Sequence, residues 1–86
     1  MKNKILAFTS PDCAACEISK PIVEKAARAH GLEIIEQDPI DDPAFAQRFD
    51  VSVLPTFVLM KNGEMCAEIH GTINEDTACR FVAMCT

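Results

Sequence analysis

Apolar residues occur in short runs along this chain, and their spacing predicts alternating strands and helices. Residues 5–8 form a continuous apolar run followed by polar and turn-forming residues, which is typical of a strand covered on both faces. The next residues, Ser10, Pro11 and Asp12, are favoured at helix starts because they cap the helix or preset its first φ angle. A helix is therefore expected to begin close to Cys13.

The apolar positions after Cys13 repeat at the interval of a helix, and a glycine marks the end of the repeat. The repeating positions are Ile18, Ile22, Ala26 and Ala29, and the terminating residue is Gly31. Pro21 lies inside this segment, where it removes one backbone hydrogen bond and predicts a kink.

The central part of the chain predicts a second strand and a short helix. The strand is expected over residues 32–37, whose apolar positions are Leu32, Ile34 and Ile35. Pro43 suits the first turn of a helix, and Phe45 and Phe49, four residues apart, would form its buried stripe.

The C-terminal part predicts a β-hairpin and a last helix. Residues 56–61 are expected to form a strand, Asn62-Gly63 is a strong hairpin signal, and residues 64–69 should return antiparallel. Asn74 is a good N-cap for the final helix. Its inward positions are expected to be Ala78, Phe81, Val82 and Cys85. The predicted order is β-α-β-α-β-β-α, in one α/β domain that spans residues 1–86.

Composition and charge exclude several classes of protein. Of the 86 residues, 49% are hydrophobic, which is enough for a folded core and excludes a disordered tail. The longest apolar stretches have four or five residues, far below the ~20 that a membrane span needs, and no signal peptide is expected at the N-terminus. The net charge of −5 argues against a nucleic-acid partner.

The cysteines indicate a reducing compartment. The chain has five cysteines, which is an odd number. Their share of the residues lies below the roughly 8–10% that marks a disulfide-stapled extracellular domain. A cytoplasmic location is therefore expected, where a close cysteine pair either does redox chemistry or binds a metal. Cys13 and Cys16 form such a pair with C-x-x-C spacing, whereas Cys66, Cys79 and Cys85 are scattered.

The position of the pair at a strand-to-helix junction favours redox chemistry. The reactive form of cysteine is the thiolate, and an ordinary thiol has a pKa near ~8.5. A helix N-terminus carries about +0.5 elementary charge and unpaired N–H groups, which stabilise a negative sulfur. Cys13 would therefore attack a substrate disulfide, and Cys16, one turn deeper, would resolve the mixed disulfide and release the reduced substrate.

A structural zinc site is the alternative for this pair, but it needs four ligands. The chain offers no second close pair, since Cys79 and Cys85 are six residues apart and the two histidines are isolated. No metal site and no cofactor is therefore expected. Cys66, Cys79 and Cys85 are expected to be small core or surface residues, with Cys79 and Cys85 as candidates for a regulatory or dimer-forming thiol.

With these elements in order, the whole chain resembles a small thioredoxin-fold oxidoreductase. Residues 13–16, Cys-Ala-Ala-Cys, follow the first strand, and Pro21 falls where thioredoxins have a helix-kinking proline. Residues 53–57, Val-Leu-Pro-Thr-Phe, resemble the segment that holds the family's cis-proline. Residues 61–64 resemble the hairpin, and Gly71 matches the glycine that closes the substrate groove.

This resemblance implies a fold, a site and a function. The fold would be thioredoxin-like, with a four-stranded mixed sheet flanked by helices, its first two strands parallel and its hairpin antiparallel. The Leu54–Pro55 bond would be cis, with Leu54 presenting backbone groups to an extended substrate, Pro55 lying against the cysteine pair and Gly71 closing the groove. The function would be reduction of protein disulfides through Cys13 and Cys16, in electron transport and cell redox homeostasis. The protein would be a monomer that a thioredoxin reductase-like enzyme or glutathione recycles.

Several positions depart from the family's pattern. Asp12 stands where thioredoxins usually have a tryptophan, and its charge would hold the pKa of Cys13 higher than the helix alone would give. The buried acid that helps to move protons at the second cysteine would fall at Ala7. That role is therefore vacant, or it passes to water or to Glu36.

Two other functions remain open on the same fold. One is a glutathione-dependent, glutaredoxin-like enzyme, which would tolerate loss of Cys16. Residues 70–76 match the glutathione-docking segment of glutaredoxins only in part, which favours a protein-disulfide reductant. The other is a non-catalytic binding module with idle cysteines, because a shared fold does not establish redox function. His70 lies close to the expected groove but is not expected to contact the substrate.

Overall fold

The computed structural model describes residues 3–84 and has the predicted order of elements. Its strands are β1 (Lys4–Phe8), β2 (Glu33–Gln37), β3 (Thr56–Lys61) and β4 (Glu64–His70). Its helices are α1 (Ala14–Ala29), α2 (Pro43–Arg48) and α3 (Glu75–Ala83). Each strand and helix lies within about a residue of the segment that the sequence predicts for it.

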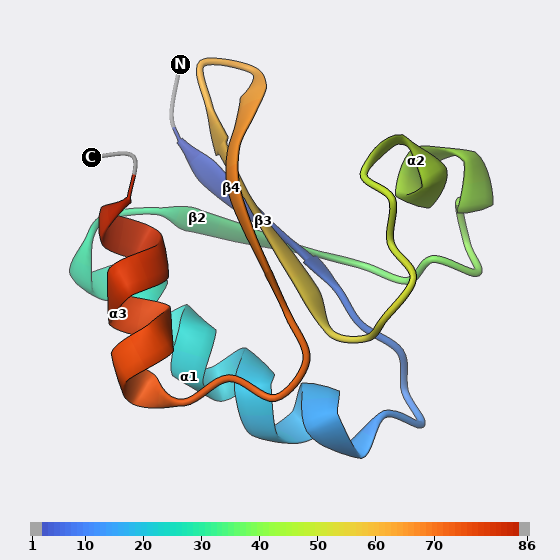
Figure 1. Ribbon diagram of the computed structural model, residues 1–86, viewed down its shortest axis with the longest axis horizontal. Helices are drawn as coiled ribbons and strands as arrows, with labels where there is room; N and C mark the ends of the chain where they lie inside the picture. The colour runs from blue at the N-terminus through green and yellow to red at the C-terminus, as the bar shows by residue number, and fades with distance from the viewer. Residues whose placement is uncertain (1–2, 85–86) are drawn as a thin grey trace.

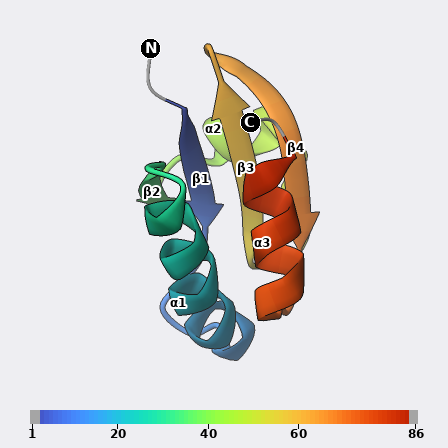
Figure 2. The same cartoon turned by 90° about the vertical axis from the view of Figure 1, so that its left-hand side faces the viewer.

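The strands form one four-stranded mixed sheet in the order β2-β1-β3-β4. β1 pairs parallel with β2 and antiparallel with β3, and β3 pairs antiparallel with β4, as expected. Helices α1 and α3 cover one face of the sheet, and α2 lies on the other (Figures 1 and 2). The thioredoxin-like fold expected from the sequence is confirmed.

Asn74 is the N-cap of α3, as the sequence predicts, and Asp42 is the N-cap of α2, whereas α1 is capped by Cys13 and not by Ser10 or Asp12. The carboxylate of Asp42 accepts from the Phe45 N–H at 3.1 Å, and the amide oxygen of Asn74 accepts from the Thr77 N–H at 2.8 Å. Each of these bonds satisfies a donor that a helix N-terminus leaves without an intrahelical partner. The hairpin turn has positive φ angles at both central residues, Asn62 (54°) and Gly63 (83°), as a tight type I′ turn requires.

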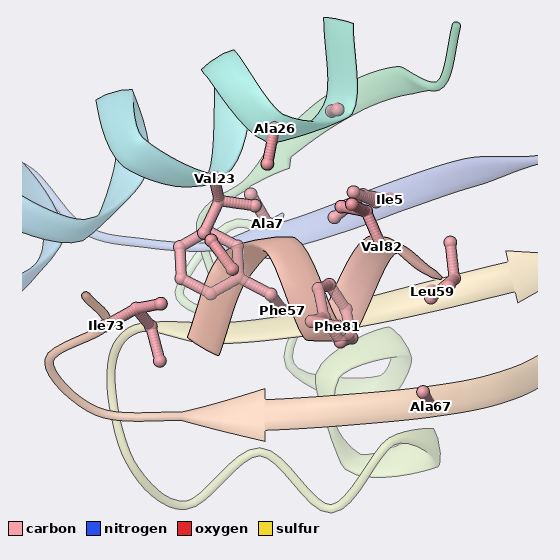
Figure 3. Packing of buried hydrophobic residues seen from close by; sticks show 12 residues of the cluster. Ile5, Ala7, Val23, Ala26, Phe57, Leu59, Ala67, Ile73, Phe81 and Val82 are labelled. Atoms are coloured by element: carbon pink, nitrogen blue, oxygen red, sulfur yellow. The ribbon is translucent and has the colours of Figure 1, made fainter. Parts of the chain in front are cut away.

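The larger part of the core lies between the sheet and the α1/α3 layer (Figure 3). It includes Ile5, Ala7, Val23, Phe57, Leu59, Phe81 and Val82, all with 1% or less of their surface exposed. Ala78, Phe81 and Val82 of α3 point into it, as predicted, whereas Cys85 lies outside the described residues.

The buried face of α1 differs from the predicted stripe. It runs through Cys16, Ser19, Val23, Ala26 and Ala27. Ile18 is 56% exposed and Ala29 is also exposed, so these two predicted positions are wrong. The apolar repeat misleads here because the buried face includes a serine, whose hydroxyl bonds to another segment of the chain.

A smaller apolar cluster fills the space between α2 and the other face of the sheet, and Leu6, Phe8, Ala46 and Val58 are its buried members. Phe45 and Phe49 are only partly buried and pack against the ring of Phe8, at centroid distances of 6.0 Å and 5.8 Å. The residue of α2 that is fully covered is Ala46, which corrects the predicted stripe. The short helix places its larger aromatic side chains at the rim of the cluster.

The second strand begins at Glu33, one residue later than predicted, because the Leu32 N–H donates to the Ala27 carbonyl at 2.9 Å and so belongs to the end of α1.

Among residues 3–84, no helix combines the length and apolarity that crossing a bilayer requires.

Candidate active site

The two cysteines of the C-x-x-C pair lie at the start of α1. Cys13 is the N-cap residue, with extended backbone angles (φ −110°, ψ 104°), and Cys16 lies in the first turn. They are joined by a disulfide bond, with their Cα atoms 5.2 Å apart. Cys16 is 3% exposed, whereas Cys13 is half-buried. The sulfur of Cys13 is therefore the more accessible of the two.

The helix start supplies a hydrogen bond to the exposed cysteine. The Cys16 N–H donates to Cys13 Sγ at 3.1 Å. This N–H is one of the donors that a helix N-terminus leaves unpaired, and it lies at the positive end of the helix dipole. In the dithiol form the same position favours a thiolate on Cys13.

The peptide bond between Leu54 and Pro55 is cis, as the sequence predicts. The sheet register opposes Phe8 to Thr56 and Thr56 to His70, so the Leu54–Pro55 segment leaves the same end of the sheet as the turn that leads to Cys13. Pro55 is fully buried and Leu54 is half-buried. Neither the N–H nor the C=O of Leu54 is bonded to another group within residues 3–84.

Gly71 lies beside the cis-proline. Its N–H donates to the Pro55 carbonyl at 2.9 Å, and its φ of +79° is an angle that residues with a side chain rarely adopt. The three residues expected to bind substrate, Leu54, Pro55 and Gly71, are thus brought together at one end of β3 and β4.

Ser19 connects the cysteine helix to this segment, and sequence reasoning missed it. Its side chain is fully buried, and its hydroxyl accepts from the Ile73 N–H at 2.9 Å and lies 3.5 Å from the Gly71 carbonyl, to which it donates. A serine on the buried face of a helix, one turn after Cys16, was the only signal for this contact in the sequence.

A polar cavity of about 380 Å³ lies beside the buried cysteine. Its lining includes Cys16, Thr9, Glu17, Lys20, Glu24 and Glu36. Glu36 accepts from the Thr9 hydroxyl at 2.9 Å, and its other carboxylate oxygen is 2.8 Å from Lys20 Nζ. Ala7, by contrast, is fully buried in the apolar cluster beneath α1.

Lys20 and Glu36 each stabilise the charged form of the other. Two hydrogen bonds lower the pKa of Glu36: the one from Lys20 has the larger effect, and the one from Thr9 has the smaller. The bond to Glu36 raises the pKa of Lys20, against a smaller opposing effect of burial. A carboxylate and an ammonium group therefore share the cavity with Cys16, in place of a carboxyl group at Ala7.

The other cysteines differ from one another. Cys79 is an exposed free thiol on α3. Cys66 is exposed on β4 but is disulfide-bonded, so the expectation that it is only a small core or surface residue is wrong. Cys85 lies outside the described residues. Within residues 3–84, no three His, Cys, Asp or Glu side chains are arranged to hold a metal ion. Redox chemistry at Cys13 and Cys16 is the chemistry that this geometry suits.

The chain is similar to known proteins over most of its length. The family model described as thioredoxin matches residues 1–84. A thioredoxin H-type of Brassica oleracea is 31% identical over 83 residues, covering 93% of this chain and 68% of that protein. Mitochondrial thioredoxin of Bos taurus is 34% identical over 74 residues, covering 84% of this chain.

The chain is shorter than several of these relatives. It spans 45% of the bovine protein and 44% of thioredoxin Y from rice chloroplasts, to which it is 26% identical over 74 residues. Among solved structures, oxidised mitochondrial thioredoxin 3 of Saccharomyces cerevisiae superposes with a TM-score of 0.75 at 26% identity, covering 84% of this chain and 69% of that one. The germline-specific thioredoxin Deadhead of Drosophila melanogaster reaches 0.86 at 22% identity, covering 99% and 82%. Because the identity to Deadhead is only 22%, this similarity shows a shared fold and nothing more.

Proposed function

The chain belongs to the thioredoxin family, and we propose that it is a thiol–disulfide oxidoreductase that reduces disulfide bonds in other proteins. One observation carries the proposal. Cys13 and Cys16 are bonded to each other at the start of α1, with the accessible sulfur of Cys13 held by a helix N–H. A pair that can open and close a disulfide, with one sulfur accessible and the other covered, is what two-step exchange requires.

In the first step, the Cys13 thiolate attacks one sulfur of the substrate disulfide. A mixed disulfide forms, and the other substrate sulfur leaves as a thiolate that takes a proton from solvent. In the second step, the Cys16 thiol loses its proton and attacks Cys13 Sγ, which releases the second substrate sulfur. Two electrons pass to the substrate, and the Cys13–Cys16 disulfide remains.

Substrate binding is proposed at Leu54, Pro55 and Gly71. The free N–H and C=O of Leu54 suit pairing with an extended stretch of substrate chain, because an unpaired backbone group at a partly buried position gains from a partner. This arrangement would bring a substrate disulfide to the end of the sheet from which the Cys13 turn emerges.

The electron source and cellular setting are parts of the same proposal. We expect a monomer in the cytoplasm that a thioredoxin reductase-like enzyme recycles. Glutathione is the alternative donor, and in that case the Cys13–glutathione mixed disulfide would be an intermediate. The net charge of −5 does not favour a nucleic-acid partner.

The roles of the two cysteines are tested with insulin as substrate and dithiothreitol as electron donor. Cys13→Ser should abolish insulin reduction, because no thiolate remains at the accessible position. Cys16→Ser, reduced beforehand and mixed with insulin after dithiothreitol has been removed, should accumulate a covalent complex with insulin that a non-reducing gel detects, because no second thiol resolves the mixed disulfide. Cys79→Ser, which removes an exposed thiol on α3, should keep at least about half of the activity. Full turnover by Cys16→Ser would overturn the assigned roles.

The glutathione alternative is tested by equilibrating the protein with glutathione buffers, alkylating free thiols and reading the Cys13–Cys16 bond by mass spectrometry. A bond that persists until the buffer is strongly reducing supports the proposed reductant. Accumulation of glutathione on Cys13 would favour the glutaredoxin-like function. Absence of a Cys13–Cys16 bond at every ratio would leave a binding module.

A further inference from the structure

His70 and Thr56 face each other across β3 and β4, at the end of the sheet where the cis-proline lies. Their backbones are paired in register, directly after Pro55 in one strand and directly before Gly71 in the other. The Thr56 side chain is fully buried, whereas that of His70 is 37% exposed. Neither side chain has a part in the thiol chemistry described above.

The two side chains form a hydrogen-bonded chain whose direction can be worked out. Thr56 Oγ1 lies 2.6 Å from the Val53 carbonyl oxygen and 2.9 Å from His70 Nδ1. A carbonyl oxygen carries no proton, so the single hydroxyl proton of Thr56 must lie on the bond to Val53. Thr56 Oγ1 can then only accept from His70, and Nδ1 must be the nitrogen that carries a proton.

His70 Nδ1–H therefore donates to Thr56 Oγ1, and the Thr56 hydroxyl donates to the Val53 carbonyl. The other ring nitrogen, Nε2, faces the Glu68 carboxylate at 3.6 Å. Because Thr56 is shielded from solvent, water does not replace His70 as the donor to its hydroxyl. The donor is present whether the ring is neutral in this tautomer or charged.

These two hydrogen bonds fix the orientation of the Leu54 N–H. The carbonyl of Val53 and the N–H of Leu54 belong to one peptide unit, which is planar and trans, so they point in opposite directions. Holding the Val53 oxygen toward Thr56 thus turns the Leu54 N–H away from the sheet end. On the other side of Leu54, the Gly71 N–H holds the Pro55 carbonyl.

We propose that His70 is a positioning residue for protein substrates, acting through Thr56 to hold the Leu54 peptide in the orientation that pairs with an extended substrate chain. The inference rests on the proposed function and adds to it a residue that acts on substrate recognition, not on the thiols. It predicts that loss of His70 impairs reduction of disulfides in polypeptides but not of small disulfides, which have no backbone to pair.

The test compares insulin with cystamine, a small aliphatic disulfide, in single turnovers of the fully reduced protein. Formation of the Cys13–Cys16 bond is followed by acid quench, alkylation and mass spectrometry. His70→Phe and Thr56→Val keep the bulk of each side chain but break the chain of bonds. Each should slow the reaction with insulin about fivefold, as expected for one lost hydrogen bond, and leave the cystamine rate within about twofold.

Conservative variants and a double variant distinguish positioning from general damage. His70→Asn places an amide donor where Nδ1 lies, and Thr56→Ser keeps the hydroxyl, so both should restore the insulin rate. Combining His70→Phe with Thr56→Val should be no slower than Thr56→Val alone, because His70 acts through Thr56. His30→Phe is the matched control, since the His30 ring bonds to the Ala26 carbonyl at the end of α1 opposite to the cysteines.

The possible results are distinct. A His70→Phe protein that is folded by circular dichroism and reduces insulin at the unaltered rate overturns the inference. An equal loss with insulin and cystamine also overturns it, because the thiols themselves would then be disturbed. If Thr56→Val does not fold, His70→Phe and His70→Asn decide the matter alone. A wild-type protein that reduces neither probe would instead overturn the proposed function.

Discussion

At the start of α1, the helix N-terminus and the side chain of Asp12 have opposite effects on the thiol of Cys13. The helix N-terminus and the Cys16 N–H favour a thiolate on Cys13. The carboxylate of Asp12, the residue before it, is exposed and disfavours a second negative charge nearby. Because Asp12 is in contact with solvent, its effect is screened and should be the smaller of the two.

Replacing Asp12 with asparagine should therefore lower the pKa of Cys13 in the reduced protein, because it removes a negative charge beside the thiolate. The pH dependence of Cys13 alkylation by iodoacetamide, read by mass spectrometry, measures this shift. Asp76→Asn is the matched control, because it removes an equal charge from α3, where Asp76 pairs with Arg80. Equal shifts in both variants would mean that net charge, and not the neighbouring carboxylate, acts on the thiol.

Residues of the site differ in how far the sequence could predict them. Cys13 and Cys16 could be predicted from local signals, their spacing and a helix start, whereas Pro55 and Gly71 were predicted from the resemblance of their segments to the thioredoxin family. Ser19 and His70 could not, since their partners lie 54 and 14 residues away along the chain. Such contacts exist only once helix, hairpin and loop have been packed against each other.

At the level of elements, one buried serine connects α1 to the loop beside the cis-proline. The Ser19 hydroxyl accepts from the Ile73 N–H, and the residue next but one before Ile73, Gly71, holds the Pro55 carbonyl. This path connects the cysteine helix to the loop after β4 and to the loop before β3. The strands and helices themselves could be predicted from apolar runs and caps, whereas this connection between them could not.

Ser19→Ala should lower the free energy of unfolding by about 1–3 kcal/mol, because it leaves the N–H of the buried Ile73 without a partner. Urea unfolding followed by far-ultraviolet circular dichroism measures this, as the chain has no tryptophan or tyrosine for fluorescence. Ser52→Ala, at an exposed position, should change the free energy by less than about 0.5 kcal/mol. A loss for Ser19→Ala as small as that for Ser52→Ala would show that solvent satisfies the Ile73 N–H.

Across the whole molecule, the two faces of the sheet contribute unequally to stability. Among residues 3–84, the cluster on the α1/α3 face has twelve buried residues and the cluster on the α2 face has four. The sequence predicted Phe45 and Phe49 as a buried stripe, but a six-residue helix with one covered alanine cannot bury both rings. How deeply a side chain is buried depends on the area of the packed layer, which the local pattern does not encode.

This asymmetry predicts different costs for two phenylalanines. Phe81→Ala, on α3, should destabilise the protein by about 3–5 kcal/mol, a large part of the roughly 4–13 kcal/mol that a domain of this size has. Phe45→Ala, on α2, should cost only about 1–2 kcal/mol, because its ring is half-buried. Urea titrations of the two variants under one redox condition give both values.

Activity should follow the same division. The cysteine helix and Ser19 belong to the α1/α3 face, so folded Phe45→Ala protein should reduce insulin at close to the wild-type rate. Phe81→Ala should lose activity in proportion to its unfolded fraction. Equal destabilisation by the two substitutions would mean that α2 and its aromatic rim support the sheet as strongly as α3 does, and the site would then depend on both layers.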